Sequence, residues 1–355
     1  MKFNYRDFKI SGILSVLPKK EISFDDEISN YKASESNSRK LKKLLGFDKR
    51  RIVEEGTTCS DLAVHGINHL LSNGLLQKED IGCILFVSVT PDYISPPTSN
   101  VIHGQLDLSD DVICLDINQG CAGFIIGVFN GFNVLNAGMD KKVVLINADI
   151  SSHIVSPNDR NTAPIFGDAA TITLIERSND INNVQVEIKN RGKDFDAIII
   201  PAGGVRTKSS IESLIVTEDG DGNQKTLHHS HMKGDLVYNF TTNDVVNTIN
   251  ETIIDNPIFK KENIDYYVFH QPNKFILNRM ADKLGLDNNL VPNNIVENFG
   301  NSNGSSIPLC LTYNFSEQLK NRYLNLFLSG FGVGLSWNIL LMRLGKLNFC
   351  DIIEY

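Results

Sequence analysis

Apolar residues follow strand-like and helix-like spacings in turn along the chain of 355 residues. Ile10 to Leu17 predicts a strand, Cys59 to Leu71 predicts a helix, and Lys78 to Val87 predicts a turn that leads into a strand. In the second half, Val245 to Ile254 predicts a helix, and Lys261 to His270 predicts a turn followed by a strand. Alternating strands and helices are typical of an α/β fold.

The second half of the chain repeats the order of the first. The segment that starts at Lys261 resembles the one that starts at Lys78, and each leads to a helix, a strand and a turn of small residues. Those turns are Gln119 to Gly123 in the first half and Asn301 to Ser305 in the second. An internal duplication of this length predicts two similar α/β lobes.

Cys121 lies where a strand is predicted to turn into a helix. Val112 to Leu115 is expected to form a short buried strand, and helical spacing begins at Phe124. Two glycines and an alanine flank the cysteine, so a substrate can approach its sulfur closely. Free N–H groups and the dipole at the start of a helix favour a thiolate. A single cysteine in such a place is more often structural, so a nucleophilic role needs support from elsewhere in the chain.

That support comes from His270 and Asn301 in the second half. Each is predicted to follow a strand, and we expect both, with Cys121, at the carboxyl ends of central strands that meet in one crevice. Taken singly, His270 fits a core histidine and Asn301 fits a turn residue or helix cap. Together with a thiol they form a nucleophilic set. The loop Gly330 to Gly334 is either an oxyanion-binding loop or an ordinary turn between strands.

Composition narrows the possible functions further. With 41% hydrophobic residues, 21% charged residues and a net charge of −8, the chain is typical of a soluble globular protein and not of a nucleic-acid binder. Its six cysteines are scattered, which favours a reducing cytoplasm over a disulfide framework or a zinc site. His228 to His231 and Asp219 to Gly222 lack metal-ligand spacing, so we expect no metal. Leu324 to Leu341 predicts two buried strands around a glycine turn and not a membrane span.

Eight motifs, in the same order along nearly the whole chain, resemble those of the thiolase-fold condensing enzymes, and specifically of the β-ketoacyl-ACP synthase III family. The matching segments are Thr90–Tyr93, Cys121–Phe124, Asp159–Thr162, Phe166–Ala170, His270–Asn273, Gly300–Ser302, Ser305–Pro308 and Phe331–Gly334.

The resemblance implies a five-layered αβαβα fold built from two duplicated lobes. Residues 1–177 would form the lobe that carries the nucleophile Cys121, and residues 178–355 the lobe that carries His270 and Asn301. It also implies a homodimer without a resident cofactor, whose substrates are thioesters of CoA or of acyl-carrier-protein phosphopantetheine.

The resemblance assigns a role to each site residue. Cys121 would take an acyl group from the donor thioester, while the backbone N–H groups of Cys121 and Val333 hold the oxyanion. His270 and Asn301 would bind malonyl-ACP and stabilise the enolate left by CO2. Further substrate contacts are implied for Arg160, Lys274, Phe331 and Gly332.

Several positions depart from the family pattern. Lys40 and Leu44 replace a Trp and an Arg that grip the adenine of CoA, Pro96 replaces a Phe that lines the partner subunit's acyl pocket, and Phe275 replaces an Arg linked to carrier-protein docking. We therefore expect an altered donor site and an altered acyl pocket. A run of basic residues is either a docking surface for an anionic carrier protein or a solvated helix face. Its members are Arg39, Lys40, Lys42, Lys43, Lys49, Arg50 and Arg51.

Three functions are compatible with these features. The first is decarboxylative condensation in a specialised lipid, polyketide or glycan-modification pathway, and the second is acyl transfer from Cys121 to an alcohol or amine. The third, a non-catalytic partner subunit, is disfavoured because Cys121, His270 and Asn301 are all retained.

Overall fold

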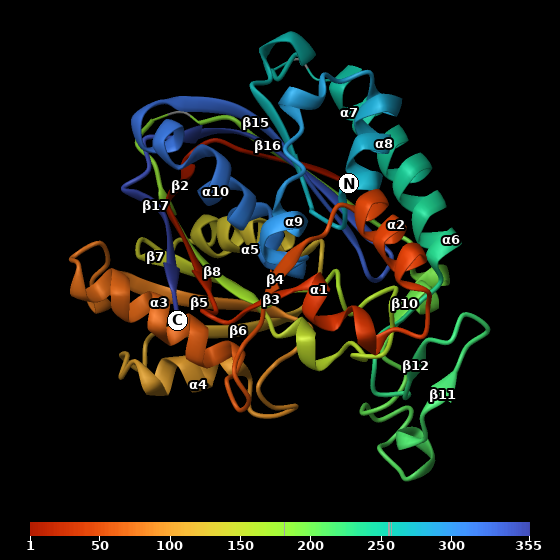
Figure 1. The fold of residues 1–355 in the computed structure, drawn as a ribbon. Helices are drawn as coiled ribbons and strands as arrows, with labels where there is room; N and C mark the ends of the chain where they lie inside the picture. The colour runs from red at the N-terminus through yellow and green to blue at the C-terminus, as the bar shows by residue number, and fades with distance from the viewer. Residues whose placement is uncertain (181, 255, 257) are drawn as a thin grey trace.

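Two large β-sheets organise the chain, with helices between them and on both outer faces (Figure 1). The computed structural model describes residues 1–180, 182–254, 256 and 258–355. The larger sheet has six strands in the order β17-β2-β8-β7-β5-β6. Their bounds are Phe349–Glu354, Phe8–Leu17, Ala169–Arg177, Lys142–Asp149, Ile81–Ser88 and Ile113–Asn118, respectively.

The second sheet repeats the arrangement of the first. Its order is β1-β9-β16-β15-β14, with bounds Lys2–Tyr5, Val184–Asn190, Ser336–Gly345, Tyr323–Gly332 and Tyr266–Phe269, respectively. From β2 to β5 and from β9 to β14, both sheets run through two antiparallel pairs and then a parallel pair. The duplication is therefore confirmed. The terminal strands cross over, because β1 pairs with β9 and β17 pairs with β2.

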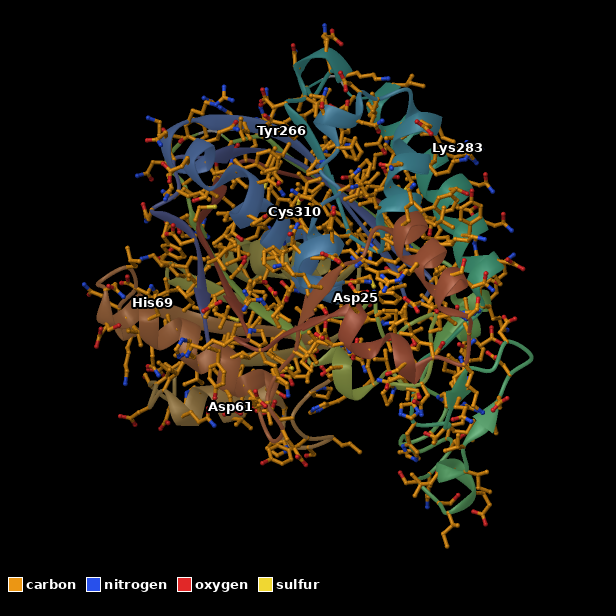
Figure 2. The ribbon with its side chains drawn as sticks, viewed as in Figure 1. Asp25, Asp61, His69, Tyr266, Lys283 and Cys310 are labelled. Atoms are coloured by element: carbon orange, nitrogen blue, oxygen red, sulfur yellow. The ribbon has the colours of Figure 1, made fainter. Side chains whose placement is uncertain are left out.

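The helices complete five layers, as expected for the thiolase fold. Between the sheets lie α5 (Gly123–Asn136) and α10 (Ser306–Asn321), whose apolar side chains join both sheets in one core. Figure 2 shows Cys310 of α10 in this interior and Lys283 of α8 at the periphery. The outer face of the first sheet carries α3 (Cys59–Ser72) and α4 (Thr98–Gln105). The outer face of the second carries α6 (Gly234–Asn239), α7 (Val246–Ile254) and α8 (Lys274–Leu284).

Shorter elements cover the open side of the molecule. Residues 21–51 form α1 (Phe24–Glu27), α2 (Glu35–Leu45) and the paired strands β3 (Glu21–Ser23) and β4 (Lys49–Arg51). A projecting arm carries β10 (Ile198–Ile199), β11 (Thr217–Glu218), β12 (Gln224–Lys225) and β13 (His231–Met232), and lies at the lower right of Figure 1. Helix α9 (Ile295–Phe299) packs against β4.

The strand before Cys121 differs from its prediction. β6 exists, but it is the edge strand of its sheet, and Ile113 and Leu115 are 44% and 45% exposed. The expectation of a buried strand is wrong because no other strand of this chain pairs with the outer side of β6 in the described residues. The glycine-rich stretch after Leu324 does form two buried strands, β15 and β16. Among the described residues, no helix has both the length and the apolar character needed to cross a membrane.

Candidate active site

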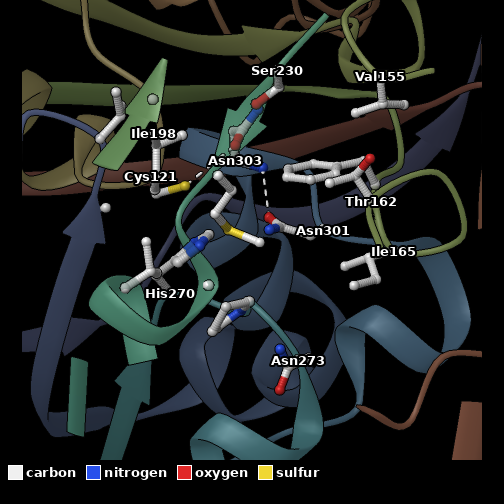
Figure 3. Close-up of a pocket in the computed structure, with 18 of the residues that line it drawn as sticks. Cys121, Val155, Thr162, Ile165, Ile198, Ser230, His270, Asn273, Asn301 and Asn303 are labelled. Atoms are coloured by element: carbon white, nitrogen blue, oxygen red, sulfur yellow. Dashed lines mark hydrogen bonds between the residues drawn. The ribbon is translucent and has the colours of Figure 1, made fainter. Parts of the chain in front are cut away.

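Cys121, His270 and Asn301 line a single cavity of about 730 Å³ between the two lobes (Figure 3). The expectation that all three follow central strands is wrong. Cys121 follows the edge strand β6 and His270 follows the edge strand β14, whereas Asn301 follows helix α9. In the duplication β14 corresponds to β5 and not to β6, so the three residues come from non-equivalent positions of the two lobes and meet in the cavity between them.

Cys121 lies two residues before α5. It is partly accessible through the cavity, and its thiol donates a hydrogen bond to Oδ1 of Asn303 at 3.2 Å. Burial raises the pKa of the Cys121 thiol to about 12, and the nearby carboxyl of Asp149 adds to the rise. The structure therefore favours the neutral thiol of Cys121 and does not support the expectation that the helix start favours a thiolate.

His270 is a neutral imidazole in this setting. Its side chain is buried, and this desolvation lowers the pKa of His270 to about 3. Nδ1 lies 2.8 Å from Oγ of Ser306, and that oxygen also accepts the backbone N–H of Gln271 at 3.3 Å. The Ser306 hydroxyl proton is consequently available to Nδ1. The edge of Phe331 meets the ring, with centroids 5.5 Å apart.

Asn301 is fixed by backbone contacts that cross between the lobes. Its N–H donates to the carbonyl of Ile165 at 2.7 Å, and its own carbonyl accepts from Gly167 at 3.1 Å. Gly167 is required by this contact, since a β-carbon there would lie 2.1 Å from the Phe299 carbonyl oxygen. Oδ1 of Asn301 accepts the Asn303 N–H at 2.9 Å, which leaves Nδ2 for a ligand in the cavity.

The loop after β15 packs directly on the turn that holds Cys121. Val333 lines the cavity and lies against Gly120, whose β-carbon position would be 3.1 Å from Val333 Cγ1. Gln119 Nε2 donates to the Val333 carbonyl at 3.4 Å. The loop is therefore held beside Cys121, and the oxyanion role of the Cys121 and Val333 N–H groups stays a prediction.

The predicted substrate contacts fall in three places. Phe331 and Gly332 line the main cavity. Arg160 instead lines a separate pocket of about 320 Å³ together with Lys40 and Leu44, the two positions at which we expect a family contact to adenine to be replaced. Lys274 lines neither pocket, and its ammonium pairs with Glu297 at 3.3 Å.

The rest of the main cavity is largely apolar. The Phe275 ring stacks on Tyr238 with centroids 5.9 Å apart. The other apolar lining residues include Ile154, Val155, Ile165, Ile198, Ile199, Met232 and Val237. β10 and β13 supply part of this wall, so the projecting arm helps to shape the cavity. Such a lining suits a hydrocarbon chain.

The run of basic residues does not form a free basic surface. Five of its seven members have acidic partners: Arg39 with Asp25, Lys42 with Asp48, Lys49 with Glu21, Arg50 with Glu27, and Arg51 with Glu354. Arg50 is also buried. Most of these charges are therefore locally paired, and docking of a carrier protein on the run stays a prediction. Only Lys40 and Lys43 lack an ion pair in the described residues.

The histidines near residue 230 hold a loop together. His228 contacts the Ser213 hydroxyl at 2.9 Å, and His229 Nδ1 accepts the Thr226 N–H at 3.0 Å. Across the described part of the chain, no group of three or more His, Cys, Asp or Glu side chains is placed to hold a metal ion.

Sequence reasoning missed three residues around the nucleophile. Ser306 contacts His270, and Asn303 contacts Cys121. Asp149 is fully buried at the end of β7, and burial raises its pKa to about 7. Asn303 and Ser306 lie within five residues of Asn301 in the sequence, and this closeness could have indicated that they belong to the site. Asp149 gave no signal, because only the fold brings β7 beside Cys121.

Comparison with known proteins agrees with this architecture. Residues 115–192 match the family model for 3-oxoacyl-[acyl-carrier-protein] synthase III, and residues 254–344 match the model for its C-terminal part. A Campylobacter jejuni protein, provisionally assigned as 3-oxoacyl-[acyl-carrier-protein] synthase 3, is 31% identical over 100% of this chain and 99% of its own length. The β-ketoacyl-[acyl-carrier-protein] synthase III of Clostridium tetani is 28% identical over 89% of this chain and 94% of its own.

Solved structures show the same likeness. The crystal structure of a 3-oxoacyl-(acyl-carrier protein) synthase from Burkholderia xenovorans superposes with a TM-score of 0.92 at 34% identity, covering 100% of this chain and 99% of that one. With the cavity, the duplicated sheets and full-length similarity in agreement, the chain belongs to the 3-oxoacyl-[acyl-carrier-protein] synthase III family, an enzyme family with the thiolase fold.

Proposed function

We propose that this enzyme loads an acyl group onto Cys121 and condenses it with malonyl-ACP, releasing CO2. The observation that carries the proposal is the pairing of a neutral His270 with the Nδ2 group of Asn301 in the cavity that holds Cys121. Two uncharged donors facing a thiol suit an oxyanion that develops on a second substrate. A charged imidazolium is not needed for this role.

In the first half-reaction, the Cys121 sulfur attacks the carbonyl of an acyl thioester. A new C–S bond forms to Cys121, the bond to the carrier sulfur breaks, and the carrier thiol leaves with the proton that Cys121 gives up. The N–H groups of Cys121 and Val333 are proposed to hold the tetrahedral oxyanion.

In the second half-reaction, the malonyl thioester loses CO2 and the electron pair moves to its thioester oxygen as an enolate. His270, with its proton on the nitrogen that faces the cavity, and Asn301 Nδ2 donate to that oxygen. The enolate carbon then forms a C–C bond to the acyl carbonyl, the bond from that carbonyl to the Cys121 sulfur breaks, and the departing thiolate takes a proton from solvent. No resident cofactor takes part in this proposal.

The donor is proposed to be an acyl-CoA or acyl-carrier-protein thioester. The largely apolar cavity supports an acyl chain, and the side pocket with Lys40 and Arg160 supports contact with an anionic part of the carrier. Loss of the family's adenine grip at Lys40 and Leu44 supports a specialised lipid, polyketide or glycan-modification pathway.

A homodimer is proposed from the free edge of β6. An exposed apolar edge strand is an aggregation hazard unless another chain covers it, and pairing of β6 with its copy would extend the sheet across both subunits. Tyr93 and Ile94 in the loop before α4 are 58% and 92% exposed and extend this apolar surface.

A cytoplasmic location is proposed because all six cysteines are free.

Malonyl decarboxylation tests the proposal directly. Wild-type protein should release CO2 from malonyl-ACP, and Asn301→Ala should slow this step on the order of 10²-fold while Cys121 acylation, followed by intact mass, changes less. Normal acylation without any CO2 release would refute condensation and leave acyl transfer to an alcohol or amine as the function.

A further inference from the structure

Asn303 contacts two residues of the candidate catalytic set. Its side-chain oxygen accepts the Cys121 thiol proton at 3.2 Å, and its backbone N–H donates to Asn301 Oδ1 at 2.9 Å. Its φ of 48° is in the left-handed region, where asparagine is one of the few well-tolerated side chains. These contacts hold Asn303 beside Cys121, and a half-turn of its carboxamide would exchange the places of its oxygen and nitrogen.

The nitrogen of the Asn303 carboxamide contacts Ser151, whose hydroxyl can act as acceptor or as donor of a hydrogen bond. Asn303 Nδ2 donates to the Ser151 hydroxyl at 2.8 Å, and Ser151 is fully buried. A serine hydroxyl both accepts and donates. If the carboxamide turned over, Nδ2 would face the Cys121 sulfur as a donor, and Oδ1 would accept from Ser151. Both orientations keep every hydrogen bond in the Cys121–Asn303–Ser151 chain.

We propose that Asn303 is a positioning residue that holds the Cys121 sulfur in both of its protonation states. The orientation seen here accepts from the thiol, and the reversed orientation donates to the thiolate. The proposal takes its relevance from the proposed role of Cys121 as nucleophile, but it does not depend on which acyl group or acceptor the enzyme uses.

A hydrogen-bond donor would stabilise the Cys121 thiolate, because the groups around the sulfur supply little positive charge. Asp149, at the end of β7, raises the pKa of Cys121, and His270 is neutral and therefore supplies no positive charge. In the described residues, Asn303 is the one side chain that hydrogen-bonds to the Cys121 sulfur. A reversed Asn303 would be the nearest side-chain source of positive partial charge for the thiolate.

The test measures the reactivity of Cys121 without any substrate. Iodoacetamide alkylation is followed by intact mass between pH 6 and 10 in a Cys114→Ser background, because Cys114 is the other partly exposed cysteine. Asn303→Asp keeps the shape and the acceptor but cannot donate and adds negative charge. We expect its pH profile to shift upward by at least about one unit, so that alkylation at pH 8 slows roughly tenfold. Ser151→Ala should shift the profile in the same direction by less.

Controls separate this role from general damage to the fold. Asn298→Asp makes the same chemical change on α9, where the side chain only donates to the Asn294 carbonyl, and should keep the parental profile. If Asn303→Asp melts below the parent, Asn303→Gly replaces it, since glycine suits the positive φ and removes both hydrogen bonds. A parental pH profile in the Asn303 variant or in Ser151→Ala overturns the proposal. Because the assay needs no thioester, its outcome is independent of whether condensation occurs.

Discussion

Gly332 lies so close to Cys121 that a β-carbon on it would stand 2.7 Å from the Cys121 β-carbon and 3.1 Å from its sulfur. Real β-carbons do not approach other carbons to 2.7 Å, so a side chain at 332 would force the nucleophile or the β15 loop to move. Gly330, one pleat earlier, makes a similar approach to the Ala122 backbone at 3.1 Å. The loop after β15 and Cys121 therefore fit together only through glycine.

Gly332→Ala should slow acylation of Cys121 on the order of 10²-fold, because a displacement of about 1 Å at a reacting atom has an effect of that size. Rapid-quench intact mass on an acyl-CoA measures the rate. Gly204→Ala is the matched control, since nothing lies within 4 Å of its β-carbon position. Equal rates in both variants would mean that the loop yields without displacing the sulfur.

Asp149→Asn should change how stability depends on pH. The folded-state pKa of Asp149 is raised to about 7 from an ordinary value of 3.8, so this carboxyl favours the fold most below pH 4 and loses that contribution as the pH rises through 7. An asparagine side chain at position 149 cannot ionise, so Asp149→Asn does not lose stability in this way. In the wild type the loss amounts to roughly 1.4 kcal/mol for each unit of pKa difference. Its free energy of unfolding relative to wild type should therefore rise between pH 4 and pH 7 in urea titrations. A constant difference across that range would contradict the assignment.

His270 should act in its neutral form throughout the working range. Burial lowers its pKa to about 3 from 6.5, so the fold loses stability as the pH falls from 6.5 towards 3, and the ring stays uncharged above pH 5. Malonyl decarboxylation should consequently show no acid limb near pH 6.5, and His270→Ala should reduce it on the order of 10²-fold at every pH tested. An acid limb near pH 6.5 that disappears in His270→Ala would instead show that the ring titrates normally.

Leu115→Lys should separate the proposed dimer. A lysine on the exposed edge of β6 would place like charges together across a two-fold contact, which disfavours edge pairing. Light scattering after size exclusion should show the mass fall from two chains to one. Leu44→Lys, on α2 and 54% exposed, is the control and should keep the wild-type mass. The same mass in wild type and in both variants would argue against this edge as the interface.

The sequence was informative where the chemistry is local. Strands and helices followed from apolar spacing, and the duplication followed from the likeness of the segments at Lys78 and Lys261. The small-residue turn at Cys121 and the segment after His270 marked the cavity. Contacts formed only by folding were not predictable. Asp149 reaches Cys121 because β7 lies in the same sheet as β5 and β6, and the exposure of Leu115 depends on β6 being the edge strand. The ion pairs of the basic run were not predictable because folding brings its acidic partners together from several segments, including Glu354 for Arg51.

The exchange of β1 and β17 between the two sheets affects how the protein unfolds. Each sheet is closed on one edge by a strand from the opposite end of the described chain. Cleaving the chain between the two lobes would separate β17 from the first sheet and β1 from the second. Each sheet would then lose one edge strand to the other fragment and expose its neighbouring strand. The two lobes duplicate one another in topology, yet they should melt as one cooperative unit.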